Sequence, residues 1–152
     1  MNVTIKKCTV AELEDSDNFG ALLREYESDL AIDGLPKPCA KIEMYRQFEA
    51  LGKIHYFGAF INNLLVGIIN VLMSENPHYG VCIAVTESYF VSKEHRKTGA
   101  GNLLRKEAEL CAEKLGSPAL FISAHGNLIL LLEGLKDYTE SGRTFFKRFN
   151  HA

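Results

Sequence analysis

The sequence predicts an α/β (α+β) fold in which a mixed sheet has helices on both faces. Two adjacent β-rich runs, residues 54–61 and 64–73, are joined by Asn62-Asn63 and predict an antiparallel hairpin. A strand–helix–strand unit from Val81 to Ala124 predicts a parallel pair at the centre of the sheet. The complete order of elements, β-α-α-β-β-β-α-β-α-β, requires helices on both faces of one sheet.

The first third of the chain predicts one strand and two helices. Residues 3–9 form the strand, and Ser16 or Asp17 is expected to cap the first helix. Residues 33–38 contain a glycine and two prolines and end that helix. The second helix stops at Gly52. Both helices have an apolar stripe at helical spacing, made of Phe19, Leu22, Leu23, Tyr26 and Leu30 in the first and Met44, Phe48 and Leu51 in the second.

The remaining elements follow from similar patterns. Residues 81–91 read as one long strand, and residues 99–115 read as a helix. A short buried strand at 119–124, a helix at 127–135 and a terminal strand at 143–149 complete the chain. Because there is no repeat, low-complexity tract or long linker, we expect a single domain over residues 1–152.

Composition excludes several classes of function. The 152 residues have a formal net charge of -2 and a pI near 6.2, so we expect neither nucleic acid nor an acidic membrane as a partner. Nothing resembles a signal peptide or an apolar run of roughly 18 residues, which predicts a soluble, cytoplasmic protein. The cysteines are far apart and predict free thiols and no metal site: Cys8, Cys39, Cys82 and Cys111.

A glycine-rich turn connects a strand to a helix at Gly99-Ala100-Gly101. Such a turn directs backbone N–H groups and the positive end of the helix dipole at one point, which favours an anion. A Cβ at Gly99 or Gly101 is expected to hold a phosphate away from these amides. His95, Arg96 and Lys97 add positive charge nearby. The alternative is a tight turn beside a solvated basic cluster.

Two common phosphate-binding patterns fail on specific residues. A Walker loop requires Lys and then Ser or Thr after its last glycine, but Asn102-Leu103 follow Gly101. A dinucleotide fingerprint requires a third glycine where Leu104 stands. It also requires an acidic residue about 20 positions on, where residues 119–122 are apolar. The anion is therefore expected to be of another kind.

The stretch from Val91 to Leu104 resembles the signature of the GNAT superfamily of N-acetyltransferases. That signature is a strand ending in Val, then Arg or Gln, two residues, Gly, one residue, and Gly or Ala at the start of a helix. Arg96 to Gly101 matches its core completely. The resemblance implies a GNAT fold with six to seven strands, splayed central strands and acetyl-CoA as cofactor. Residues 138–149 are also loosely similar to phage and bacterial acetyltransferases.

The resemblance also implies which residues hold coenzyme A. The pantetheine arm would pair with the backbone of Phe90 and Val91 and lie in a V-shaped gap beside residues 119–124. Asn127 either contacts the cofactor or caps a helix. The pyrophosphate would be held by the loop residues Arg96, Lys97, Thr98, Gly99, Ala100, Gly101 and Asn102.

Glu87 is the candidate general base, because a primary ammonium with a pKa near 10 must lose a proton before it attacks a thioester. It is the only carboxylate of residues 81–91, and strand alternation places it on the same face as Tyr89 and Val91. A solvated or ion-paired strand carboxylate is the other interpretation. A backbone N–H near Phe90 or Val91 would polarise the carbonyl.

The tyrosine that often protonates the leaving thiolate in this family is missing from residues 127–135, where Glu133 takes its place. Tyr138 is the nearest substitute, and water is another proton source. Residues 26–45 would wall the acceptor site. Acidic side chains there suit a cationic amine, although a solvated helix face explains them more simply.

The function expected from this resemblance is acetyl transfer from acetyl-CoA to a small-molecule or protein amine, by direct attack in a ternary complex. The alternative is a weak or inactive GNAT-fold protein that binds coenzyme A or has a structural role. A homodimer is common in the family and is possible here.

Overall fold

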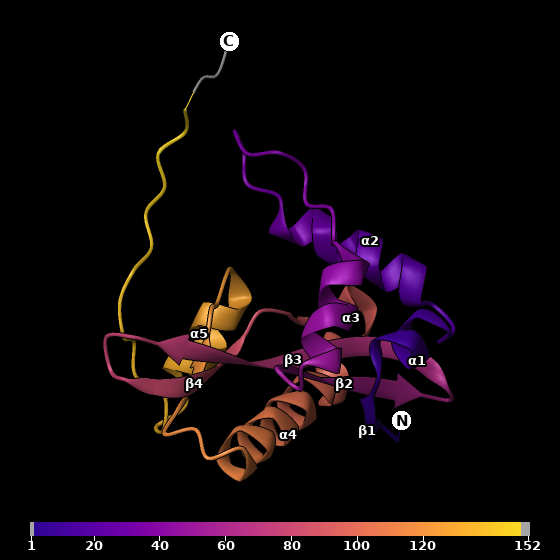
Figure 1. Ribbon diagram of the computed structural model, residues 1–152. Helices are drawn as coiled ribbons and strands as arrows, with labels where there is room; N and C mark the ends of the chain where they lie inside the picture. Colours follow the sequence, from indigo (N-terminus) through magenta and orange to yellow (C-terminus); the bar gives the residue numbers. More distant parts are fainter. Residues whose placement is uncertain (1, 150–152) are drawn as a thin grey trace.

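A six-stranded sheet forms the centre of the computed structural model, which describes residues 2–149 (Figure 1). The strand order is β1-β2-β3-β4-β6, and β5 pairs with β3. Only β4 and β6 are parallel, so the predicted mixed sheet is confirmed. The strands are Thr4–Cys8 (β1), Ile54–Ile61 (β2), Leu64–Asn76 (β3), Val81–Thr86 (β4), Tyr89–Val91 (β5) and Leu120–Ile122 (β6).

Helices cover both faces of this sheet, as predicted. In Figure 1, α4 lies against one face, and α1, α2 and α3 lie over the other. Each face has its own buried cluster: Leu104 and Val91 belong to the cluster under α4, whereas Leu22 and Phe90 belong to the cluster under the other three helices. The helices are Val10–Glu14 (α1), Phe19–Leu30 (α2), Ile42–Ala50 (α3), Ala100–Lys114 (α4) and Asn127–Glu133 (α5), with the 3-10 helix Lys93–Thr98 (η1) before α4.

The start of the first long helix differs from the prediction. The short helix α1 was not predicted, although Thr9 and Glu12 form a capping box that the sequence pattern T-x-x-E signals. The longer helix α2 begins after α1, at Phe19, and its N-cap is Asn18 in the left-handed conformation (φ 74°). Neither predicted cap residue caps α2, and the Ser16 hydroxyl instead donates to the Glu12 carbonyl (2.7 Å). The cap prediction was wrong.

The predicted hairpin is confirmed. Asn62 and Asn63 both have positive φ (49° and 66°), which is the conformation that two-residue hairpin turns require. The predicted stop of α3 is also confirmed, because Gly52 follows the helix with φ 67°.

The predicted single strand over residues 81–91 is two strands, β4 and β5, separated by a β-bulge. Leu72 pairs with Val85 and Ile69 pairs with Tyr89, so two residues of β3 lie opposite three residues of the other strand. The extra residue reverses the alternation of side chains. The prediction that Glu87 shares a face with Tyr89 and Val91 was therefore wrong: those two pack in the cluster under α4, whereas the Glu87 carboxylate contacts Tyr45 of α3.

The predicted terminal strand at residues 143–149 is absent from the structure. This segment has no regular secondary structure, and the yellow trace of Figure 1 runs away from the sheet. Phe145 is 88% exposed. A run rich in aromatic residues favours a strand, but a strand forms only where a neighbour supplies its hydrogen bonds, and no described strand pairs with this segment.

Three further observations concern the predicted absences. Within residues 2–149, no helix is long and apolar enough to cross a bilayer. Across the same residues, no group of three or more His, Cys, Asp and Glu side chains is placed to hold a metal ion. All four cysteines are free thiols.

We expect Gly67→Ala to destabilise the sheet, because β3 and β5 approach too closely at this position for a side chain. A Cβ on Gly67 would lie 2.9 Å from the Phe90 carbonyl oxygen and 2.9 Å from Val91 Cγ2. Such overpacking costs about 1–3 kcal/mol of unfolding free energy, measurable by urea titration. The control is Gly142→Ala, whose Cβ meets nothing within 4 Å. Equal stability of both variants would contradict the expectation.

Candidate active site

The bulge between β4 and β5 is held by Asn70, a fully buried residue of β3. The Asn70 Oδ1 accepts hydrogen bonds from the backbone N–H groups of Glu87 (2.9 Å) and Ser88 (3.1 Å). The Asn70 backbone N–H donates to the Ser88 carbonyl (3.0 Å). A bulge interrupts the regular strand ladder, and the Asn70 side chain supplies the acceptor that its two amides require.

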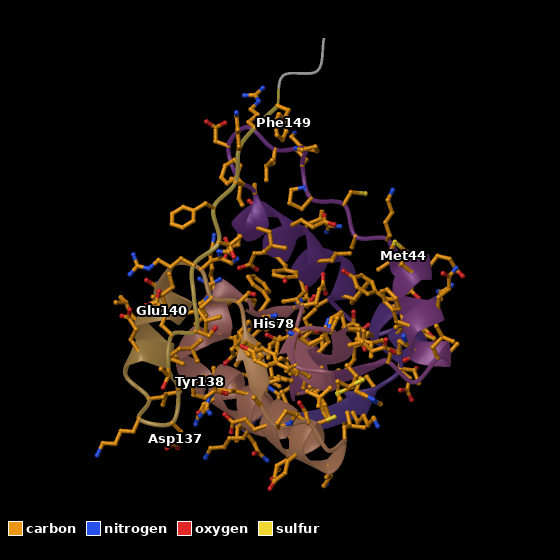
Figure 2. All side chains as sticks on the ribbon, turned by 60° about the vertical axis from the view of Figure 1, so that its left-hand side comes forward. Met44, His78, Asp137, Tyr138, Glu140 and Phe149 are labelled. Atoms are coloured by element: carbon orange, nitrogen blue, oxygen red, sulfur yellow. The ribbon has the colours of Figure 1, made fainter. Side chains whose placement is uncertain are left out.

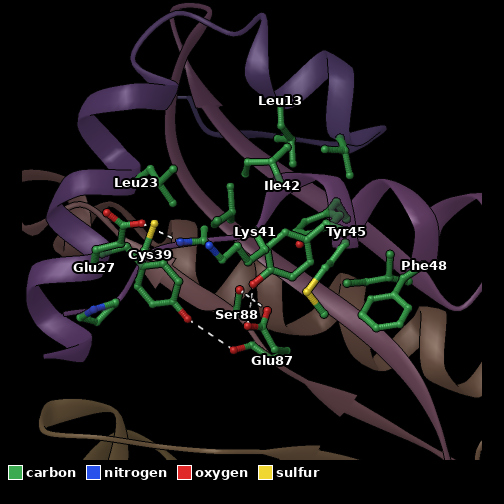
Figure 3. A pocket seen from close by; sticks show the side chains of 18 of the residues that line it. Leu13, Leu23, Glu27, Cys39, Lys41, Ile42, Tyr45, Phe48, Glu87 and Ser88 are labelled. Carbon is green, nitrogen blue, oxygen red and sulfur yellow. Dashed lines mark hydrogen bonds between the residues drawn. The ribbon is translucent and has the colours of Figure 1, made fainter. Parts of the chain in front are cut away.

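The Glu87 carboxylate at this bulge is held by three donors, of which Tyr45 and Ser88 are labelled in Figure 3. The Tyr45 hydroxyl donates to Oε1 (2.8 Å), whereas the Ser88 hydroxyl (2.6 Å) and Asn70 Nδ2 (3.0 Å) donate to Oε2. The Glu87 residue is nevertheless exposed, so its carboxylate is fixed in orientation and open to a ligand. A fixed and accessible carboxylate can accept a proton from a bound molecule.

Three neutral tyrosines lie near Glu87, and of these Tyr45 donates to its carboxylate. Burial raises the pKa of the Tyr26, Tyr45 and Tyr56 hydroxyls, and for Tyr45 the hydrogen bond to Glu87 raises the pKa further. These hydroxyls therefore stay protonated at neutral pH. The Tyr26 hydroxyl donates to the Glu87 carbonyl (3.4 Å), so α2 also contacts the bulge.

A cavity of about 380 Å³ lies beside Glu87, between the sheet and helices α1, α2 and α3. Glu87 and Ser88 lie on its sheet side, and Tyr26 and Tyr45 line it from α2 and α3. The bulge directs both consecutive side chains, Glu87 and Ser88, to this cavity. Residues 38–42 complete its wall, which agrees with the wall expected at residues 26–45.

The glycine-rich turn begins helix α4 immediately after η1. Gly99 is the N-cap and has φ 87°, a conformation that disfavours any side chain. Leu103 donates to the Gly99 carbonyl, so the amides of Gly101 and Asn102 precede the first intrahelical bond. The Ala100 N–H donates a hydrogen bond to the Thr98 hydroxyl (3.4 Å). The start of α4 thus presents amides to an anion, and a phosphate fits this turn.

The two glycines of this turn differ in what an added Cβ would meet. A Cβ on Gly101 would lie 3.4 Å from the Tyr89 hydroxyl and 3.7 Å from Val91 Cγ2, so it would point toward the sheet and not toward an anion. A Cβ on Gly99 would meet nothing within 4 Å, so backbone conformation and not crowding explains that glycine.

Helix α2 fixes the loop between β5 and α4 through acidic side chains. Asp29 pairs with Arg96 Nη2 (2.7 Å) and Lys93 Nζ (3.1 Å), and Glu25 accepts from the Lys93 N–H (2.8 Å). Arg96 Nε donates to the Val91 carbonyl (3.0 Å), and its guanidinium lies over the Phe90 ring. The Arg96 side chain therefore contacts α2, and Lys97 beside it is exposed.

The outer edge of β5 is open, and this produces the expected splay. Strand β6 pairs with β4 through Thr86 and does not reach β5 among the described pairings. Backbone hydrogen bonds join Ser88 to Asn70 and Ser92 to Val66 of β3. Phe90, which lies midway between Ser88 and Ser92, therefore also directs its N–H and C=O groups toward β3. Alternation then turns the backbone of Val91 to the open edge, whereas that of Phe90 pairs with Ile68.

Two other predicted site residues lie at the start of α5 and beyond its end. Asn127 is the exposed first residue of α5, and Gly126 is the N-cap, so Asn127 is not the helix cap. The Tyr138 hydroxyl donates to Glu109 of α4 (2.7 Å), and burial, followed by this hydrogen bond, raises its pKa to about 12. In Figure 2, Tyr138 lies well apart from Met44, which lines the cavity. The structure does not bring Tyr138 together with the Glu87 cluster.

Sequence reasoning missed two residues that build the site. Asn70 is the only polar residue within residues 64–73, and an isolated polar residue in an otherwise apolar strand signals a specific buried partner. Tyr45 lies beside Met44 in α3, and the apolar stripe of this helix predicts the helix but not a role for Tyr45. No sequence signal connects Tyr45 to Glu87, because 42 residues separate them.

We expect Asn70→Ala to lower the unfolding free energy by at least about 2 kcal/mol, because the amides of Glu87 and Ser88 lose their buried acceptor. Urea titration measures this loss. Asn2→Ala, which changes an exposed asparagine at the start of the described chain, is the control and should be nearly neutral. A neutral Asn70→Ala would show that the bulge does not depend on this side chain.

The pairing of Asp29 predicts a pH-dependent contribution to stability. The hydrogen bond from Arg96 lowers the pKa of Asp29 in the folded protein below its ordinary value near 3.8. The pairing therefore stabilises the fold fully above that ordinary value, and this contribution disappears as the pH falls through the lower folded value.

Asp29→Asn should consequently cost less than about 1 kcal/mol at pH 7 and nothing at pH 2, because the pair is partly exposed. Thermal unfolding across this pH range measures the difference, and Asp33→Asn in the following loop controls for the loss of one charge. A cost that persists at pH 2 would contradict the pairing.

The comparisons with known proteins agree on the fold. No protein-family model matches the sequence, and no curated protein matches it significantly. Several solved structures are nevertheless similar over nearly the whole chain. A ribosomal-protein-alanine N-acetyltransferase from Brucella melitensis biovar Abortus 2308 is 18% identical, with a TM-score of 0.72, and the match covers 98% of this chain and 100% of the other.

Two other structures give the same result. AAC(6')-Iy, in complex with the bisubstrate analogue CoA-S-monomethyl-acetylneamine, is 13% identical with a TM-score of 0.72, covering 99% of this chain and 100% of the other. A GNAT family acetyltransferase from Staphylococcus aureus is 13% identical with a TM-score of 0.65, covering 98% and 100%. With its six-stranded mixed sheet, helices on both faces and open β5 edge, this chain has the GNAT fold.

Proposed function

We propose that this protein is an N-acetyltransferase that transfers an acetyl group from acetyl-CoA to an amine in a ternary complex. The observation that carries the proposal is the position of Glu87. Its carboxylate is fixed at the bulge, beside a cavity on one side and the open edge of β5 on the other. This position supports a role for Glu87 as the proton acceptor between the proposed acceptor site and the proposed cofactor site.

The proposed cofactor site follows β5 into α4. The amides of Gly101 and Asn102 would hold the pyrophosphate, together with the rest of the turn, which comprises Arg96, Lys97, Thr98, Gly99 and Ala100. Of the two residues expected to bind pantetheine through their backbone, Val91 has the open edge available, whereas Phe90 is paired with β3. The likeness to AAC(6')-Iy, which was solved with a coenzyme A conjugate, supports this assignment.

The residues of the chain can perform the two tasks that the reaction requires. Acetyl-CoA, when bound, supplies the thioester whose acetyl group is transferred. Glu87 accepts a proton from the acceptor ammonium, which frees the nitrogen lone pair for attack. The Val91 N–H is placed to donate to the carbonyl oxygen as negative charge develops there. Because the Tyr138 hydroxyl is hydrogen-bonded to Glu109, water is the better source of the proton for the leaving thiolate.

Two measurements test this proposal in sequence. Calorimetric titration with acetyl-CoA measures cofactor binding, and a thiol-release assay over a panel of amines measures transfer. Binding together with turnover supports an acetyltransferase. Binding without turnover on any amine would instead support a GNAT-fold protein that binds coenzyme A without chemistry.

We expect Glu87→Gln to lower kcat/KM by about 10²- to 10⁴-fold at pH 7, because glutamine cannot accept the ammonium proton. The deficit should shrink above pH 10, where the acceptor amine loses its proton without help. Rates measured between pH 6 and pH 10.5 give this profile. Glu75→Gln, on the exposed end of β3, is the matched control. Parallel profiles for Glu87→Gln and the unmodified protein would remove Glu87 from proton transfer.

A further inference from the structure

We propose that the acceptor is a primary amine with a single positive charge and an apolar body, such as an alkylamine or arylalkylamine. This inference rests on the proposed acetyltransferase function and specifies its substrate class. The apolar body would occupy the cavity between α1, α2, α3 and the sheet, and the amine would lie at the Glu87 end.

Most of the side chains that line the cavity are apolar. Leu13 of α1, Leu23 of α2, and Ile42 and Phe48 of α3 surround it in Figure 3. Ile68 and other side chains of β2 and β3 form its floor. Its volume of about 380 Å³ is within the range of small-molecule sites, which are mostly apolar with a few convergent polar groups. The lining therefore favours a ligand whose main part is hydrocarbon.

The charges of the lining match a single ammonium. Two carboxylates, Glu27 and Glu87, and one ammonium, Lys41, line the cavity, which leaves one net negative charge. Glu27 already accepts a hydrogen bond from the Ala40 N–H (3.0 Å) and holds the loop before α3. Glu87 is thus the carboxylate best placed for the ligand. A second ammonium would have to lie among apolar side chains, where an unpaired charge is costly.

The acidic side chains of α2 do not form a separate surface for a polycation. Glu25 accepts from the backbone of Lys93, and Asp29 pairs with Arg96 and Lys93. These carboxylates stabilise the loop that precedes α4, as described above. The acidic character of residues 25–29 is therefore explained by contacts within the chain and adds little attraction for a multiply charged acceptor.

A series of acceptors tests the inference on the unmodified protein. Ethanolamine, n-butylamine, n-hexylamine and 2-phenylethylamine are compared in the thiol-release assay with acetyl-CoA. Each additional buried methylene should raise kcat/KM about fourfold, so n-hexylamine should exceed n-butylamine by roughly tenfold or more. Neamine and spermidine, which carry several ammonium groups, should be poorer than n-hexylamine. A flat series, or a preference for neamine or spermidine, would overturn the inference.

A pair of variants on one helix tests whether the cavity causes the preference. Met44 lines the cavity and is 51% exposed, whereas Leu51 is 69% exposed at the end of the same helix and does not line it. Met44→Gln should reduce the ratio of kcat/KM for n-hexylamine to that for ethanolamine at least threefold. Leu51→Gln should leave this ratio unchanged. An equal effect of both variants would contradict a role for the cavity.

Failure of this inference can be told apart from failure of the proposed function. Turnover with a preference for polycations would retain the acetyltransferase and remove the apolar acceptor. Absence of turnover on every amine would remove the proposed function. In that case calorimetric titration of n-hexylamine against ethanolamine still tests the cavity: tighter binding of n-hexylamine, lost in Met44→Gln, supports it, and equal or absent binding overturns it.

Discussion

The hydrogen bonds between Asn70 and the bulge after β4 determine how the rest of the site is arranged. One buried amide oxygen accepts from two consecutive amides, those of Glu87 and Ser88, and stabilises an extra residue in the strand. That residue turns Tyr89 and Val91 to the face covered by α4 and leaves Ser88 beside Glu87 on the other face. It also ends the pairing of β4 with its neighbours, so that β5 continues against β3 with an open outer edge.

Both proposed binding sites depend on this irregularity. Without the extra residue, strict alternation from Ala84, which packs under α4, would still place Glu87 on the face of α1, α2 and α3. It would, however, turn Ser88 away from the cavity and put Tyr89 and Val91 on the same face as Glu87. The chain leaves the sheet after Val91, and the 3-10 helix η1 leads from there to α4, whose N-cap is Gly99. The Glu87 carboxylate therefore precedes the three residues of β5, and the loop that leads to α4 follows them.

The acidic residues of helix α2 illustrate how a pattern can have more than one physical explanation. In the sequence they are consistent either with attraction for a cationic acceptor or with a solvated helix face. In the structure, Asp29 and Glu25 contact Lys93, and Asp29 also contacts Arg96. They connect α2, which lines the cavity, to the loop of the proposed cofactor site, a role that neither interpretation included.

Local patterns in the sequence determined much of the fold: the hairpin at Asn62-Asn63, helix α4 with its glycine turn, and helices on both faces of a mixed sheet. Each depends on residues close together in the chain, where backbone conformation and apolar periodicity act directly. Only the tertiary structure decided that Glu87 and Tyr89 lie on opposite faces of the sheet, which residues contact Tyr138, and that the described residues 143–149 form no strand. These depend on a buried amide, a distant carboxylate and a neighbouring strand, and such contacts between remote segments leave no periodic signal in the sequence.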